Sequence, residues 1–514
     1  MGQTRASRAV AGTATSFLQY GLLMALQFAL APVVLRLAGQ EVLGAYSFIL
    51  QVMGWAALTD LGFGVAISRS LAQAHGMEDE RKRFRDVFVT GRTFLSASNL
   101  VFGLVLLGVG WNVDNIMSMS PTAEDQARTA VFLLAAWVAI RIPVSLYGEA
   151  LIATQNLAAA NIIVALGNAL RLLLSLLFVF LGWELIGLMA GFVLAEAAIA
   201  CTQRFWYRRL YPEDKFGWGV PDRGLFREMF NFGLTYMVMV VAGRLSASTD
   251  SIIVGYLYGA AAVSVYYTSQ MPGTVLYQLI WKPTDNSAPA LNELHARRAF
   301  PQITVTYLRL LRYTLLLILP LSVGIAAFNR SAIMLWVGEA QYAGGLFTAA
   351  LAVFSFTQVV IHLNAIVLVA YGRVRAMSLF SLCAGIVKVV LALQLGKNVG
   401  LAGVMIANAS VDIAAIVFYD YSVRKLLGLS FSKVWRDAVS PVARAIVPPA
   451  FALIVFFALM PSVAWYSLLF WVSVYTLMTA VGAWSLGLLP DERDQVTVYV
   501  KNGLNLAVGK SGGM

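Results

Sequence analysis

The apolar positions of this chain fall into long uninterrupted runs, unlike the one-sided stripes of helices in a soluble protein. Each run approaches the length of about 20 residues that an α-helix needs to cross the hydrocarbon core of a bilayer. The pattern therefore predicts about fourteen membrane-spanning helices joined mostly by short polar segments. The expected spans cover residues 12–35, 42–68, 87–110, 129–150, 159–181, 185–206, 229–254, 263–284, 307–328, 343–370, 376–396, 401–423, 445–462 and 465–488.

The composition agrees with a membrane protein. Hydrophobic residues make up 59% of the 514 positions and charged residues only 12%, whereas soluble domains carry about 25% charged residues. The two cysteines, Cys201 and Cys383, lie in apolar runs without a CxxC neighbour. They therefore indicate neither a disulfide framework nor a metal or redox centre.

The positive charges predict the orientation of the spans. Lys and Arg gather in alternate loops, as in "RKRFR" (81–85) and "RFWYRR" (204–209). Because basic loops stay in the cytoplasm, we expect both termini there, with the basic loops against anionic membrane lipids. The same bias explains the net charge of +11, so the charge gives no reason to expect a nucleic-acid partner. The other loops hold isolated cations only, at Arg36, Arg128, Arg330 and Lys397.

Short segments recur in the same order in two halves of the chain. The segment 41–48 matches 261–268, which pairs Tyr46 with Tyr266, and "IGL" (186–188) matches "VGL" (399–401). A third match, between 153–171 and 370–388, pairs Arg171 with Lys388. Duplications of this kind are common in transporters, where the site lies between the related halves.

The repeat predicts an all-α polytopic membrane protein with two six-helix lobes, related by a pseudo-two-fold axis around a central cavity, and two extra C-terminal helices. We expect the tail to be disordered. The expected parts are an N-lobe (1–206), a cytoplasmic inter-lobe loop (207–228), a C-lobe (229–424), helices 13 and 14 (425–488) and a cytoplasmic tail (489–514).

Several cations lie inside expected spans, where a charge is costly and usually faces a water-filled pathway or a partner. Arg141, Arg171 and Lys388 lie deep in their spans, and Arg244 lies nearer the outer end of its own. We expect these four to line the cavity and bind an anion, since the planar guanidinium group of Arg can hold phosphate oxygens in pairs. Arg92, close to the inner end of its span, is expected to snorkel to the interface.

Two carboxylates, Glu196 and Asp412, lie deepest among the acidic residues of the spans. Two roles stay open for them. They could take up and release a coupling ion, H⁺ or Na⁺, or they could neutralise cations, Glu196 with Arg171 and Asp412 with Lys388. No GxxxxGK[ST] loop, HExxH motif or Cys/His cluster occurs, so we expect no enzyme activity, no catalytic residue, no metal and no cofactor.

Three segments carry a family likeness: "DLGFGVAISR" (60–69), "DSIIVGYLYGAAAVSVYYTSQMP" (250–272) and "APALNEL" (288–294). Together they resemble the O-antigen (Wzx-type) polysaccharide flippases of the multidrug/oligosaccharidyl-lipid/polysaccharide exporter superfamily, over roughly residues 10–425. The resemblance implies alternating access through a cationic cavity between two lobes. It also implies transfer of an undecaprenyl-diphosphate-linked oligosaccharide to the outer leaflet of the bacterial inner membrane, alongside polysaccharide polymerase and chain-length machinery.

Two alternatives stay open. A cation-coupled exporter of small, usually cationic, drugs from the same superfamily is disfavoured, because deep cations outnumber deep anions in the expected spans. The excess positive charge would repel a cationic drug. A membrane polymerase or ligase of the polysaccharide pathway should carry a large outer loop with catalytic residues. The longest expected outer loop, about 111–128, is modest.

Overall fold

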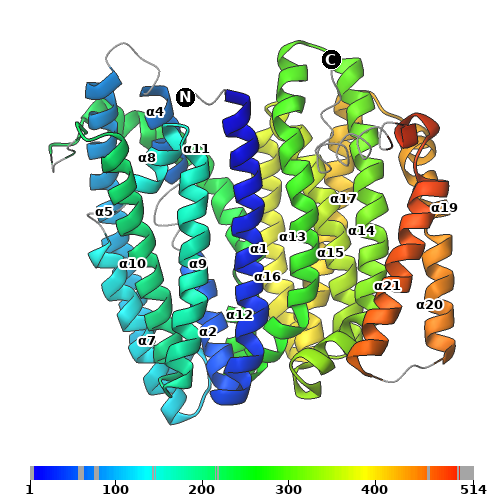
Figure 1. Cartoon of the computed structure of the whole chain (residues 1–514), viewed down its shortest axis with the longest axis horizontal. Coiled ribbons are helices and arrows are strands. Elements are labelled where there is room, and N and C mark those ends of the chain that lie inside the picture. Colours follow the sequence, from blue (N-terminus) through cyan, green and yellow to red (C-terminus); the bar gives the residue numbers. More distant parts are fainter. Residues whose placement is uncertain are drawn as a thin grey trace, which may run out of the picture. The chain divides into compact units, whose positions relative to one another are not determined.

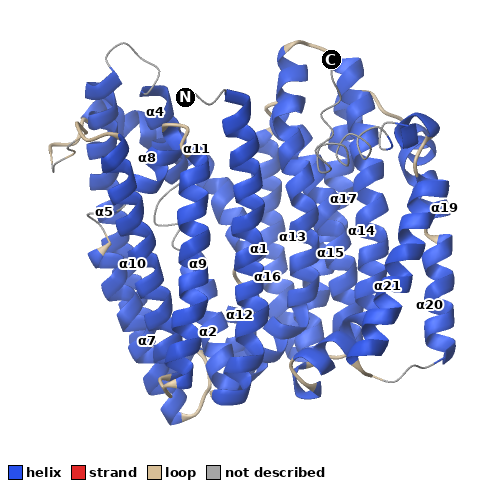
Figure 2. Cartoon of the chain, in the orientation of Figure 1, coloured by secondary structure: helices blue, strands red, loops and turns tan. Residues whose placement is uncertain are grey.

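Helices account for almost all of the secondary structure, and the described part of the chain contains no β-strand (Figure 2). The computed structural model describes residues 5–55, 63–74, 80–141, 144, 146–214, 216, 219–459, 463–494 and 497. The helices, most of them labelled in Figure 1, are α1 (Arg5–Leu37), α2 (Gly39–Gly54), α4 (Phe63–Ala74), α5 (Glu80–Trp111), α6 (Val113–Ile116), α7 (Pro121–Ile140), α8 (Tyr147–Ala153), α9 (Leu157–Phe180), α10 (Glu184–Leu210), α11 (Arg223–Ala247), α12 (Asp250–Tyr258), α13 (Ala260–Ala296), α14 (Phe300–Trp336), α15 (Gly345–Ala370), α16 (Val374–Val399), α17 (Leu401–Leu427), α18 (Phe431–Val434), α19 (Ser440–Ala445), α20 (Val447–Leu459) and α21 (Trp465–Gly482), with short 3-10 or π turns at Glu339–Gln341, Trp435–Val439 and Ala483–Gly487.

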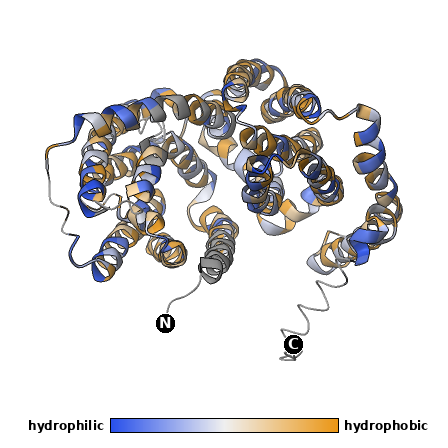
Figure 3. Ribbon diagram, turned by 90° about the horizontal axis from the view of Figure 1, so that it is seen from above, coloured by the Kyte–Doolittle hydropathy of each residue, from blue (hydrophilic) through white to orange (hydrophobic). Residues whose placement is uncertain are grey.

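The membrane-spanning character predicted from the apolar runs is confirmed. Within the described residues, nine helical segments are long and apolar enough to cross a membrane, and Figure 3 shows hydrophobic colour along most helices. The other expected spans fall on shorter or more polar helices, namely α1, α2 with α4, α7 with α8, α11 with α12, and α13. As far as the described residues reach, each expected span coincides with one helix or with consecutive helices, and parts of the spans 42–68, 129–150 and 445–462 lie outside the described residues. The chain is an all-α polytopic membrane protein.

Some expected spans are broken into two helices, which corrects the placement of Arg141. Helix α7 ends at Ile140 with Arg141 as its C-cap, and Leu146, just before α8, adopts a left-handed φ of 77°. Arg141 therefore lies at a helix end, where the negative end of the helix dipole favours a cation, instead of inside a continuous helix. Arg244 occupies a similar place, in the last turn of α11.

The described chain forms two compact units. The first comprises residues 1–268 and 378–404, and the second comprises 269–377 and 405–514. The segment 378–404, which comprises most of α16 and the first residues of α17, therefore packs with the first unit, although it lies beyond the first boundary in sequence. The lobe bounds expected from the sequence repeat stay a prediction.

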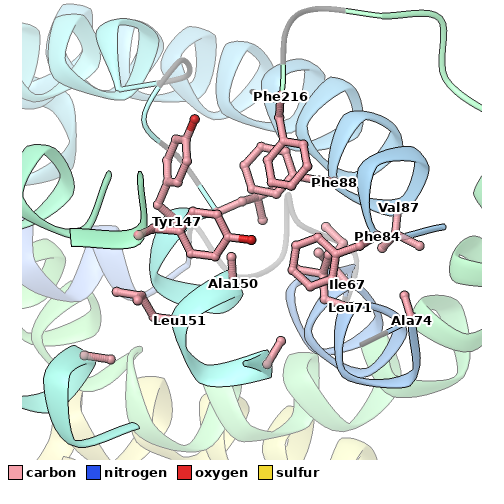
Figure 4. Packing of buried hydrophobic residues seen from close by; sticks show 14 of the residues in the cluster. Ile67, Leu71, Ala74, Phe84, Val87, Phe88, Tyr147, Ala150, Leu151 and Phe216 are labelled. Atoms are coloured by element: carbon pink, nitrogen blue, oxygen red, sulfur yellow. The ribbon is translucent and has the colours of Figure 1, made fainter. Parts of the chain in front are cut away.

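An aromatic cluster in the first unit fastens part of the expected inter-lobe loop (Figure 4). The Phe216 ring stacks on Phe88 with 4.6 Å between centroids, and the Tyr207 hydroxyl donates to Asp214 Oδ2 at 2.9 Å. Arg92 is buried beside this cluster and donates from Nη1 to the Phe216 carbonyl at 3.4 Å. The expectation that Arg92 snorkels to the interface is therefore wrong, because the cluster supplies a buried acceptor.

A buried ion cluster in the second unit fixes the beginning of the expected tail. Arg312 and Glu492 are 4% and 1% exposed, and Arg312 Nη2 bonds to Glu492 Oε1. Arg312 Nη1 also donates to the Asp437 carbonyl, and Arg309 Nε lies 3.5 Å from the same Glu492 oxygen. The prediction of a disordered tail is wrong for residues 490–494, which form a helical segment tied to α14.

Removing the Glu492 charge should destabilise the protein. Glu492→Gln leaves the Arg312 guanidinium buried without its counter-charge, which costs on the order of 3–5 kcal/mol. The matched control is Glu339→Gln, which breaks the exposed pair with Arg330 and should cost at most about 1 kcal/mol. The measurement is the thermal unfolding midpoint of the purified protein in detergent. Equal midpoints for the two variants would show that the buried pair contributes nothing special.

Candidate functional site

Arg171 lies at the centre of a buried polar group in the first unit. Its side chain, 9% exposed on α9, donates from Nη2 to the Tyr46 hydroxyl of α2 at 3.1 Å. The guanidinium carbon lies 5.0 Å from the centroid of the Phe192 ring on α10, a geometry in which the ring face attracts the cation. Residues from two other helices thus hold Arg171 in place.

Small residues set the helix spacing around Arg171. A Cβ atom at Gly191 of α10 would lie only 2.8 Å from the Ser175 backbone nitrogen of α9, so the two helices approach closely there. This close approach brings the next residue, Phe192, against Arg171. Gly44 of α2 serves the same purpose, because a Cβ there would lie 1.7 Å from the carbonyl oxygen of Ala260.

The approach at Gly44 brings the two repeat segments 41–48 and 261–268 into contact. Tyr46 and its repeat counterpart Tyr266 are both buried, but they have different partners. Tyr46 bonds to Arg171, whereas the Tyr266 hydroxyl donates to Asp250 Oδ2 at 2.9 Å. The neighbouring Tyr267 lies within electrostatic range of both Tyr46 and Arg171.

Arg141 and Glu196 extend the group around Arg171. Arg141 Nη2 donates to Asn99 Oδ1 of α5 at 3.1 Å. The half-buried Glu196 carboxylate interacts electrostatically with Arg171 and, more weakly, with Arg141. Within the described part of the chain, no ion-pair contact joins Glu196 to either arginine, and the buried Nε atoms of both arginines have no hydrogen-bond acceptor. We call Arg141, Arg171, Glu196, Tyr46 and Asn99 the Arg171 cluster.

Lys388 and Arg244 belong to the same unit as the Arg171 cluster. Lys388 is 2% exposed on α16, and Gly385, one turn earlier, packs against Leu245 of α11. Arg244 is next to Leu245 in sequence, and its Nη1 would lie 3.4 Å from a Cβ atom placed on Gly54 of α2. All four cations predicted to bind the substrate therefore fall in the first unit.

Asp412 belongs to the second unit and has partners of its own there. It is buried on α17, where Gln358 Nε2 donates to its Oδ2 at 2.7 Å and Thr357 Oγ1 at 3.4 Å. The two predicted carboxylates thus lie in different units, Glu196 within electrostatic range of two arginines and Asp412 with Gln358 and Thr357 among its hydrogen-bond donors. Among the described residues, no three His, Cys, Asp or Glu side chains are grouped to hold a metal ion.

Sequence reasoning missed most of the neutral partners of these charges. Tyr46 could have been found, because it recurs as Tyr266 in the second repeat copy. Phe192 and Asn99 carry no such signal, since an aromatic residue or an amide in an apolar run looks the same wherever it points. The buried Arg312 lies inside the expected span 307–328, and no local signal points to its partner Glu492, which is far away in sequence.

The comparisons with known proteins agree with this architecture. The sequence profile of the family described as "Polysaccharide biosynthesis protein" matches residues 9–295. A Shigella flexneri protein named as an O-antigen transporter is 21% identical over 301 residues, covering 59% of this chain and 70% of the relative.

Similar solved structures belong to the multidrug/oligosaccharidyl-lipid/polysaccharide exporter (MOP) superfamily. An inward-facing multidrug resistance transporter of the MATE family superposes with a TM-score of 0.67 at 15% identity, covering 80% of this chain and 98% of its own. A transporter of the superfamily from Pyrococcus furiosus gives a TM-score of 0.59 at 15% identity, covering 83% and 96%. These structures show the fold, and with the O-antigen relative they confirm the resemblance found in the sequence. Because the profile covers more than half of the chain, this multi-pass membrane protein belongs to the polysaccharide biosynthesis protein family.

Proposed function

We propose that this transporter is a flippase that moves an undecaprenyl-diphosphate-linked oligosaccharide from the cytoplasmic to the outer leaflet of the bacterial inner membrane. The family and the fold support a transporter, and the O-antigen relative supports a lipid-linked sugar as its cargo. Both termini would lie in the cytoplasm, as the basic loops indicate. Polysaccharide polymerase and chain-length machinery would receive the flipped unit. The chain would move its substrate by alternating access without breaking a covalent bond, and it would need no cofactor beyond a coupling ion.

The observation that carries the proposal is the pair of unsatisfied guanidinium groups in the Arg171 cluster. Arg171 and Arg141 each donate one hydrogen bond from Nη2, to Tyr46 and Asn99, and each keeps a buried Nε without an acceptor. A buried donor without an acceptor is costly, so an oxygen-rich anion that supplies acceptors would be favoured. The diphosphate of the lipid carrier supplies such oxygens and can accept paired bonds from Arg.

The charges of the first unit distinguish this cargo from a cationic drug. Arg141, Arg171, Arg244 and Lys388 are buried or half-buried there, whereas Glu196 is the one predicted carboxylate of the unit. A cationic drug would have to enter next to these like charges, which costs free energy. An anionic headgroup would instead be attracted, and Glu196 would limit its affinity enough to permit release.

Deletion of the gene in its host tests the function directly. We expect the lipid-linked repeat unit to accumulate in the inner leaflet, because its synthesis continues while its transfer stops. Leaflet location can be measured by the access of a membrane-impermeant sugar-modifying reagent to spheroplasts and to inverted vesicles. Normal surface polysaccharide in the deletion strain, with no accumulated intermediate, would refute the proposal.

Neutral substitution of the two repeat-related cations should impair transfer. Arg171→Gln and Lys388→Gln each remove charge-assisted hydrogen bonds worth about 1.5–3 kcal/mol, so each should reduce the transfer rate about 10- to 100-fold. The measurement is complementation of the deletion strain at equal membrane abundance. Lys397→Gln is the control, because this exposed lysine lies on the same helix as Lys388.

A further variant separates substrate binding by Arg171 from its structural contact. Tyr46→Phe removes the hydrogen bond to Arg171 but leaves the cation in place. We expect Tyr46→Phe to retain most of the transfer, because the guanidinium is still available to the diphosphate. If Tyr46→Phe fails as completely as Arg171→Gln, then the interaction with Tyr46, and not substrate binding, explains the importance of Arg171.

The two carboxylates should differ when each is replaced by its amide. We propose that Asp412, a buried carboxylate that accepts hydrogen bonds from Gln358 and Thr357, binds the coupling ion, and that Glu196 balances the charge of Arg171 and Arg141. Asp412→Asn should then make transfer in vesicles independent of an imposed H⁺ or Na⁺ gradient, whereas Glu196→Gln should leave the gradient dependence intact. Unchanged gradient dependence in Asp412→Asn would remove Asp412 from the coupling mechanism.

A further inference from the structure

A cavity of about 460 Å³ opens in the second unit, and none of its lining residues belongs to the Arg171 cluster. It lies where α15 and α17 end and α16 begins. Its polar wall contains the side chains of Arg373, Lys425 and Tyr421, and its apolar wall contains Leu368, Met377 and Phe418. The volume is in the range of sites that hold small molecules.

The position of the cavity along the helices matches the depth of lipid headgroups. Three membrane-spanning segments, Gly345–Ala370, Val374–Val399 and Leu401–Leu427, have their ends at the cavity. The end of a span marks the boundary between hydrocarbon and headgroups, where lipid phosphates lie. These helix ends also adjoin basic segments, which the charge pattern assigns to the cytoplasmic side.

The two cations of the cavity are not neutralised by acidic side chains. Arg373 and Lys425 are exposed, and within the described residues no carboxylate pairs with either of them. The neighbouring acid, Asp420, is instead paired with Arg424, whose Nε lies 2.6 Å from its Oδ2. The α16 N-terminus, which begins at Val374 beside Arg373, adds the positive end of a helix dipole. The polar wall therefore carries a net positive potential.

The remaining walls suit an amphiphile better than a free ion. Lys425 Nζ lies 5.9 Å from the centre of the Tyr421 ring, so an aromatic face and a hydroxyl group accompany the cation. Through Leu426 the cavity adjoins a second one of about 480 Å³, whose walls include Phe300 and Tyr371. A free phosphate would use only the cationic wall, whereas a lipid would also cover the apolar and aromatic surface.

We propose that this cavity, which we call the Arg373 pocket, binds the phosphate headgroup of an anionic membrane lipid. Arg373 and Lys425 contact the phosphate oxygens, and the Tyr421 hydroxyl donates to the headgroup. The lipid chain lies along Met377, Phe418 and Leu426 toward Phe300. Basic pockets between the ends of membrane helices bind anionic headgroups by this combination of charge and apolar contact. The site does not depend on the identity of the transported substrate.

The test compares two double variants with the same change in charge. Arg373→Gln/Lys425→Gln removes both cations of the Arg373 pocket. Arg375→Gln/Lys433→Gln removes two exposed cations that do not line it. The full-length protein in detergent is titrated with phosphatidylglycerol, and binding is measured by native mass spectrometry and by the shift of the unfolding midpoint. We expect the pocket variant to bind at least about tenfold more weakly, and the control to bind like the wild type.

Other ligands test whether the bound phosphate belongs to a lipid, and a cavity-filling variant tests whether the lipid occupies this cavity. Phosphatidylcholine should bind more weakly than phosphatidylglycerol, and inorganic phosphate alone should not reproduce the shift. Ala376→Trp fills the cavity from an exposed lining position without changing charge, and it should also weaken lipid binding. Equal lipid binding by the two double variants would overturn the proposal. A full shift with inorganic phosphate would show an anion site and not a lipid site.

Discussion

A guanidinium group buried among apolar helices needs hydrogen-bond acceptors from its neighbours, because those neighbours have replaced most of its water. This requirement shapes the first unit around Arg171. The Tyr46 hydroxyl satisfies one donor and the Phe192 ring covers the charge, but the Nε donor is left without an acceptor. An incoming anion would be favoured at such a site, because it supplies hydrogen-bond acceptors to guanidinium donors that the protein leaves without one.

The second unit holds a buried arginine with partners of another kind. Arg312 reaches a carboxylate on Glu492 and a backbone carbonyl at Asp437, and its pairing ties the end of the described chain to α14. Both units thus bury arginine, yet the partners differ in kind. Arg312 contacts a carboxylate directly, whereas Arg171 bonds to a tyrosine hydroxyl and has Glu196 only within electrostatic range. The two arginines thus differ in their partners, although both are buried.

Close helix packing makes these contacts possible. Gly44 and Gly191 allow α2 and α10 to approach their neighbours to distances that any Cβ atom would forbid. In a membrane, where apolar burial between helices gains little over lipid, such small residues and the polar contacts beside them drive association. Tyr46 and Phe192 follow these glycines by one or two positions, so the packing and the site are built from the same short segments.

The sequence by itself determined the helical membrane fold, the positions of nearly all spans and the unusual cations inside them. These features follow from local composition, since a run of apolar residues has few alternatives to a membrane helix. The repeat also singled out Tyr46 and Arg171, although their contact could not be read from it. Only the tertiary structure decided which partner each charge has. Tyr46, Asn99 and Gln358 approach their partners from helices that are distant in sequence, and Glu492 reaches Arg312 from beyond the last expected span. Arg92 and the tail were misjudged for this reason, because burial and pairing depend on which helix faces meet, and an apolar run does not encode that locally.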